Sequence, residues 1–250
     1  MFRWQQRHSL PRPPRPRYPA RVSTASPLRR LLLCWLPPLV VALVVVSIYH
    51  RQTLQSGLDL VQSVENDSLF IGFVLEHWHR ALGGAVSWHS PQMYHPVLQT
   101  LGNSDALVGV ALPYHLLRVA GLDPFVALNV TTLLVTLLGF AACYLLLRRF
   151  FSLSVLASCV GAAFFAMSHP RFTQQVHLQL QFLCLSPLTL WAFLYVLRDG
   201  VRAPPLRLLV VAAAGGVLLS LQLATAIYVC WFLVLLLALL MLVGLAVRPF

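Results

Sequence analysis

The sequence predicts an all-α protein, a polytopic bundle of transmembrane helices with an outer loop of juxtamembrane amphipathic helices. Of its 250 residues, 58% are hydrophobic and only 10% are charged, whereas soluble domains carry about 25% charged residues. Several apolar runs reach the roughly 20 residues that a helix needs to cross a bilayer. A polar stretch at 50–103 separates the first of these runs from the others.

The N-terminal segment is basic and rich in proline. Eight of the 18 basic residues lie in the first 30 positions, and no acidic residue accompanies them. Because such a segment repels itself and cannot bury a core, we expect 1–30 to form a disordered tail that stays in the cytoplasm. The remaining basic residues mostly mark the ends of apolar runs, so the net charge of +11 does not indicate nucleic-acid binding.

The first apolar run, 31–49, predicts a membrane helix that is retained. It carries no charge, and no small-residue cleavage site follows it, so a signal anchor is favoured over a cleaved signal peptide. We expect the region 50–124 to lie on the outer side of the membrane. The region 125–250 then forms the rest of the bundle, which we expect to be truncated at its C-terminus.

The later apolar runs alternate with groups of arginines. The runs lie at 104–120, 125–147, 152–167, 180–197, 208–224 and 227–247. The positive-inside rule assigns the arginine groups at 148–149, 198–207 and 248 to the cytoplasm, which leaves no room for 104–120 as a full crossing. That run also holds Asp105, His115 and Arg118, so we expect an interfacial or re-entrant helix. The alternative, a full span at 104–120, inverts every later loop.

The outer loop contains a second helical pattern. Between 68 and 82 apolar residues recur at spacings of three and four, which is typical of an amphipathic helix. The polar side carries Glu76, His79 and Arg80, and we expect His77 and His79 to be surface residues of this helix. The pair Gly83-Gly84 predicts its end.

Asp67 lies where this helix should begin, and two interpretations of it compete. It could cap the helix N-terminus, as could Asn66 and Ser68. It could also be a carboxylate at the water–lipid boundary that takes a proton or coordinates a divalent cation. The two roles are compatible, and Glu65 is near enough in sequence to share the second.

The order of these segments resembles the GT-C superfamily of membrane glycosyltransferases, which includes protein O-mannosyltransferases, aminoarabinose transferases and oligosaccharyltransferases. In that family an acidic motif follows the first span, where Glu65-Asn66-Asp67 stands here. The segment 94–98 is similar to the proline-containing stretch that opens the second juxtamembrane helix. The runs 121–129 and 165–172, together with His177 and Gln179, resemble uncharacterised bacterial members.

The resemblance implies a site and a substrate. Asp67 is expected to be the catalytic base toward an acceptor hydroxyl or, alternatively, a ligand to Mg²⁺ or Mn²⁺, and Glu65 is near enough to share the catalytic role. The donor is expected to be a polyprenyl-phosphate-linked sugar, with Arg171, His169, His177 and His95 as substrate-binding residues. The expected location is a bacterial inner (plasma) membrane with a cytoplasmic N-terminus. The resemblance does not identify the sugar or the acceptor.

Two other functions stay open at the sequence level, a transporter or flippase subunit and a non-catalytic membrane scaffold. A transport pathway predicts ionisable residues inside the spans. The apolar runs instead hold mostly neutral polar residues such as Asn129, Thr131, Thr132 and Gln222.

Overall fold

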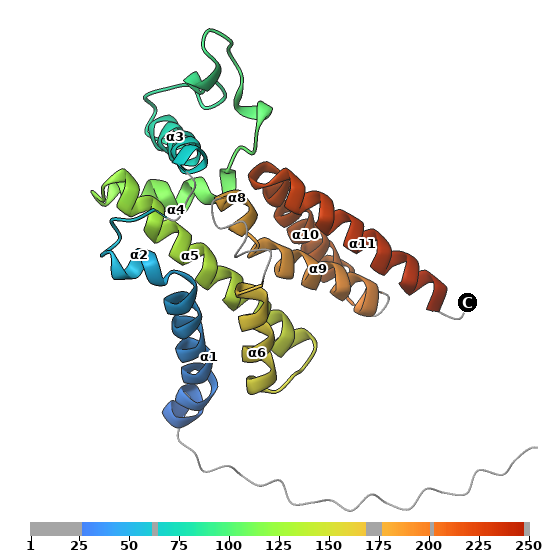
Figure 1. Ribbon diagram of the computed structural model, residues 1–250. Helices are drawn as coiled ribbons and strands as arrows, with labels where there is room; N and C mark the ends of the chain where they lie inside the picture. Colours follow the sequence, from blue (N-terminus) through green and yellow to red (C-terminus); the bar gives the residue numbers. More distant parts are fainter. Residues whose placement is uncertain (1–26, 62–64, 169–176, 201–202, 248–250) are drawn as a thin grey trace, which may run out of the picture.

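The computed structural model describes residues 27–61, 65–168, 177–200 and 203–247, and throughout these ranges the regular structure is helical (Figure 1). The α-helices are α1 (Pro27–Tyr49), α2 (Arg51–Gln55), α3 (Glu65–Leu82), α4 (Val108–Val119), α5 (Pro124–Leu145), α6 (Val155–Ala166), α8 (Leu178–Gln181), α9 (Leu185–Asp199), α10 (Pro205–Thr225) and α11 (Ile227–Val247). Two 3-10 turns, η1 (Gln92–Tyr94) and η2 (Leu101–Asn103), lie between α3 and α4, and the π-helical turn η3 (Leu146–Phe150) extends α5.

Three of the described helices are long and apolar enough to cross a membrane: Pro124–Phe150, Pro205–Thr225 and Ile227–Ala246. They match the runs predicted at 125–147, 208–224 and 227–247. The other predicted spans correspond to apolar helices with shorter described stretches. Of these, α6 has only 12 residues and is therefore about 18 Å long, which is less than the roughly 30 Å of a hydrocarbon core.

The first helix begins earlier than the sequence predicted. α1 starts at Pro27 rather than Leu31 and is 23 residues long, so Arg29 and Arg30 belong to the helix and not to the tail. A proline is well placed at a helix start because its missing N–H has no partner there in any case. The rest of the predicted tail, 1–26, lies outside the described residues.

Helix α5 is the centre of the fold. Asp123 caps its N-terminus by accepting a hydrogen bond from the Phe125 backbone N–H at 2.9 Å, and Pro124 occupies its first turn. One apolar cluster joins α5 to α1 and α6 around Phe140, Tyr144 and Ala162. A second cluster joins α5 to α3, α4 and α8 around Val74, Tyr114 and Val135.

Hydrogen bonds between distant segments show how the helices alternate in direction. At one end, which we call the α4 end, the Gly109 N–H donates to Thr225 Oγ1 at 2.8 Å and the Ile227 N–H donates to Asp105 Oδ1 at 2.8 Å. At the opposite end, which we call the arginine end, Arg198 reaches the carbonyl oxygen of Phe150. Helices α5, α9 and α11 therefore run from the α4 end to the arginine end, and α10 returns.

The run predicted as one helix over 180–197 is broken. The short helix α8 ends at Gln181, and α9 starts only at Leu185. Pro187 lies in the first turn of α9, where a residue without an N–H is tolerated, whereas inside a continuous helix it would remove a hydrogen bond. The carbonyl oxygen of Phe182, freed by the break, accepts a hydrogen bond from Gln222 Nε2 of α10 at 3.2 Å.

Helix α4 is too short to cross a bilayer. It has 12 residues, which span about 18 Å, and it lies across the upper end of the longer helices together with α3 (Figure 1). This geometry agrees with the interfacial or re-entrant helix expected at 104–120.

Candidate functional site

Asp67 and His177 meet at the α4 end although 110 positions separate them in the sequence. His177 Nε2 lies 3.4 Å from Asp67 Oδ2, with side-chain exposures of 34% and 48% respectively. This distance is longer than a normal hydrogen bond, so the two groups contact without a tight bond. Both side chains keep access to solvent, and a substrate could reach them.

Asp67 is not the N-cap of its helix. Helix α3 begins at Glu65, so Asp67 is the third residue of the first turn, and the capping interpretation is wrong. A carboxylate in the first turn is still favoured, because the unpaired N–H groups there create a positive potential. The end of α3 at Leu82, followed by Gly83-Gly84 with Gly84 at φ 76°, was predicted correctly.

The position of His177 depends on the short helix α8 that follows it. Leu178 and Gln181 are buried, and the hydroxyl of Tyr49 in α1 donates to Gln181 Oε1 at 2.8 Å. Within the described part of the chain, two buried atoms of this segment have no hydrogen-bond partner, His177 Nδ1 and Gln179 Oε1. Buried polar atoms are normally paired, so these two are exceptions among the described residues.

The structure assigns the other predicted site residues to different places. Glu65 is the first residue of α3, but its side chain, like His169 and Arg171 in full, lies outside the described residues. His95 is exposed in the loop after η1 and, within the described chain, forms no ion pair with Asp67. The segment 94–98 opens no helix, because η1 ends at Tyr94 and the next long helix begins only at Val108.

A second polar cluster, which the sequence reading missed, joins α3 to α4. Glu76 Oε1 accepts hydrogen bonds from Tyr114 Oη and from Arg118 Nε, each at 2.5 Å. Arg118 also donates to the carbonyl oxygen of Leu122. The face of α3 that was expected to meet solvent therefore docks on α4. In the sequence, the signal for this contact was a glutamate and an arginine on two successive amphipathic helices.

Neither His77 nor His79 is a plain surface residue of α3, contrary to expectation. His77 is 8% exposed, and its Nε2 lies 2.9 Å from the carbonyl oxygen of Trp88. The Nδ1 atoms of His79 and His115 lie 3.1 Å apart, so one ring donates a proton and the other must accept it. Both histidines thus attach α3 to its neighbours.

The α3–α4 cluster shifts the pKa values of its members. Burial acts to raise the pKa of Glu76, but the hydrogen bonds from Arg118 and Tyr114 outweigh it, and the net pKa lies below the ordinary 4.5. Burial lowers the pKa of His79 below 6.5; Glu76 opposes this effect, and Arg118 and His115 reinforce it. Burial, followed by the hydrogen bond to Glu76, raises the pKa of Tyr114. The cluster therefore holds an ionised Glu76–Arg118 pair beside a neutral His79.

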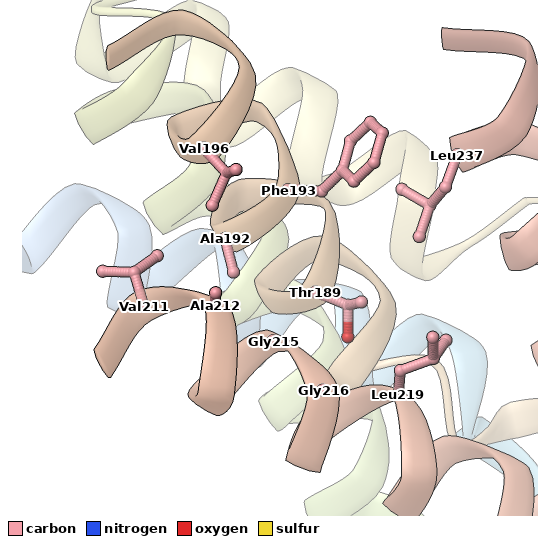
Figure 2. A pocket seen from close by; sticks show the side chains of 10 residues that line it. All are labelled: Thr189, Ala192, Phe193, Val196, Val211, Ala212, Gly215, Gly216, Leu219 and Leu237. Carbon is pink, nitrogen blue, oxygen red and sulfur yellow. The ribbon is translucent and has the colours of Figure 1, made fainter. Parts of the chain in front are cut away.

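Two hollows lie beside α11, and their linings differ. An apolar cavity of about 230 Å³ lies between α9, α10 and α11, and its only side-chain hydroxyl, that of Thr189, already donates to the Leu185 carbonyl (Figure 2). A groove of about 550 Å³ at the α4 end has a polar rim of Asn103, Ser104 and Asp105 and a wall of Tyr228, Trp231 and Phe232. The first lacks groups that could orient a substrate, whereas the second suits a molecule with a polar head and an apolar tail.

Within the described ranges no three His, Cys, Asp or Glu side chains converge in a way that could hold a metal ion. The Asp67–His177 pair offers one carboxylate and one imidazole. Mg²⁺ often takes one or two carboxylates from the protein and the rest of its ligands from substrate phosphates and water, and Asp67 fits that limited role.

Comparison with known proteins adds no assignment. No family model, curated protein or solved structure matches the chain.

Proposed function

We propose that the chain acts as a GT-C-type membrane glycosyltransferase that moves a sugar from a polyprenyl-phosphate donor to an acceptor hydroxyl. The observation that carries the proposal is the contact between Asp67 and His177 at 3.4 Å. Both were expected site residues, and they come from segments on either side of α5. A carboxylate and an imidazole that meet this way, open to solvent, suit proton transfer from a hydroxyl.

The proposal includes a polytopic arrangement in a bacterial plasma membrane. The α4 end faces the outside, and the arginine end and the N-terminus face the cytoplasm, as the positive-inside rule favours. The alternation of α5, α9, α10 and α11 supports this arrangement, because it collects Arg148, Arg149, Arg198 and Arg207 at the end opposite to α4.

In the proposed reaction Asp67 takes the proton of the acceptor hydroxyl as its oxygen attacks the anomeric carbon. The new carbon–oxygen bond forms while the bond from that carbon to the phosphate oxygen breaks, and polyprenyl phosphate leaves. Direct displacement inverts the anomeric centre. His177 orients Asp67 and binds a substrate hydroxyl or phosphate oxygen, and Arg171 and His169 are the proposed phosphate ligands. Mg²⁺ or Mn²⁺, held by Asp67, would neutralise phosphate charge if bound.

Two further features support a lipid-linked donor and an enzyme rather than a transport pathway. The groove at the α4 end combines a polar rim with an aromatic wall. Polar side chains of α5 have partners inside the protein: Thr131 and Thr132 donate to backbone carbonyls of α5 itself, and Asn129 donates to the carbonyl of Leu58. The Asn129 bond joins α5 to the segment that precedes α3.

The test is donor turnover by the 250-residue chain in lipid nanodiscs. Labelled polyprenyl-phosphate hexoses are supplied with a panel of hydroxyl acceptors, and released polyprenyl phosphate is measured. We expect Asp67→Asn to lower kcat about 100-fold or more, because a positioned base contributes at least this much. We expect His177→Gln to raise KM more than it lowers kcat.

The matched control is Asp59→Asn, since Asp59 is an exposed carboxylate between α2 and α3. It should keep the wild-type rate. Turnover by Asp67→Asn equal to that of the wild type would show that Asp67 is not the base. No turnover of any donor by the wild-type chain would favour a scaffold or transporter.

A further inference from the structure

Arginines from three separate elements gather at the arginine end. Arg148 and Arg149 lie in η3, Arg198 lies in the last turn of α9, and Arg207 lies in the first turn of α10. The four arginines are not neighbours in the sequence, since 59 positions separate the first from the last. Helix α9 packs against both η3 and α10, so the arginines of all three elements lie at the same end of the fold.

Contacts hold several of these guanidinium groups in fixed positions. Arg198 lies 4.2 Å from the centre of the Phe150 ring and also reaches the Phe150 carbonyl oxygen. Arg207 lies 5.2 Å from the centre of the Tyr195 ring, and Arg148 donates to the Leu153 carbonyl at 2.9 Å. Stacking on an aromatic face uses none of the five N–H donors of a guanidinium, so the stacked Arg207 can still donate to an anion.

The surroundings of the group are apolar and exposed. Phe151 is 48% exposed, Leu156 is 74% exposed and Leu206 is 72% exposed. A cluster of positive charge bordered by bare apolar side chains matches the boundary between headgroups and acyl chains. Asp199 is the acidic residue nearest in sequence, and one carboxylate leaves four arginines with an excess of positive charge.

We infer that the surface formed by the arginines of η3, α9 and α10 binds the headgroup of an anionic phospholipid. The phosphate accepts hydrogen bonds from Arg149 and Arg207, Arg148 and Arg198 border it, and the acyl chains lie along the exposed apolar side chains. Guanidinium groups suit this ligand because each can donate two parallel hydrogen bonds to phosphate oxygens. This inference needs the chain to be in a membrane but does not depend on the glycosyltransferase proposal.

The experiment measures retention of phosphatidylglycerol and phosphatidylcholine by the full-length chain, using native mass spectrometry and thermal stability in detergent. We expect preferential retention and stabilisation by phosphatidylglycerol. Arg149→Gln and Arg207→Gln should each weaken its binding about fivefold. Arg80→Gln is the matched control, because Arg80 is an exposed arginine of α3, and it should change nothing.

A second pair of variants keeps the test decisive if charge removal disturbs folding. Arg149→Lys and Arg207→Lys keep the charge but lose the paired hydrogen bonds, so a bound headgroup predicts weaker retention with an unchanged elution profile. Equal retention of the two lipids by the wild type would overturn the inference. So would equal stabilisation by inorganic phosphate, or a loss in Arg80→Gln as large as in the other variants.

Discussion

Gly109, in the first turn of α4, lies against Phe182, which follows α8, and against Thr225 of α10. A Cβ atom there would lie 2.6 Å from Phe182 Cε1 and 2.6 Å from Thr225 Oγ1. Neither neighbour can retreat easily, because Phe182 is 4% exposed and the Thr225 hydroxyl is held between the Gly109 N–H and the Leu221 carbonyl. The missing side chain therefore sets how closely the α4 end can pack.

We predict that Gly109→Ala destabilises the protein by about 1–3 kcal/mol through overpacking. Thermal unfolding in one detergent measures the effect. Gly216→Ala is the control, since a Cβ there meets nothing within 4 Å; it should gain about 0.5–1 kcal/mol from reduced chain entropy in α10. Equal unfolding temperatures for the two variants would contradict the close packing at Gly109.

At the scale of elements, the docking of α3 on α4 combines an ion pair with a histidine pair, and both respond to acid. Because the pKa of His79 lies below 6.5, the unfolded state binds a proton that the folded state does not. Stability is then present above pH 6.5 and falls as the pH drops below it. The lowered pKa of Glu76 acts the same way, but only below 4.5.

We therefore predict two steps of destabilisation on acidification, one for each group. Unfolding temperatures measured from about pH 7.5 down to about pH 5 isolate the first step. His79→Gln should flatten the curve over this range. His89→Gln, which alters a loop histidine in contact with its neighbours Ser87 and Trp88, is the control and should keep the wild-type slope. A wild-type curve that is flat from about pH 7.5 to about pH 5 would contradict the prediction for His79.

The sequence predicted elements where local signals decide the structure. The apolar run at 125–147 located α5, Gly83-Gly84 marked the end of α3, and the polar residues of 104–120 argued against a full span. The sequence did not predict features that depend on a contact with a residue far away in the chain. The break before α9 is stabilised by Gln222, which lies 40 positions from Phe182. An amphipathic pattern also does not show whether Glu76 contacts Arg118 or water.

At the scale of the whole molecule, the residues of the candidate site could be predicted from the sequence, but the contacts between its helices could not. Asp67 and His177 were both expected from the resemblance, and their contact arises because the chain leaves the α4 end through α5 and returns to it by His177. The polar docking cluster around Glu76 could not be predicted, because it requires the relative rotation of two short helices. Only the positions of residues along one helix follow from its periodicity.

The last prediction concerns which ends share a side of the membrane. Since α4 is docked on α3 through the bonds from Tyr114 and Arg118 to Glu76, residues before and after it should lie on the same side. Single cysteines at Ala85, Ala120 and Arg149, in a chain whose native cysteines are replaced, report this with an impermeant thiol reagent on intact cells. All three positions are exposed. We expect labelling at 85 and 120 and protection at 149, because α5 separates 120 from 149. Opposite labelling at 85 and 120 would make α4 a span and move His177 away from the face assigned to Asp67.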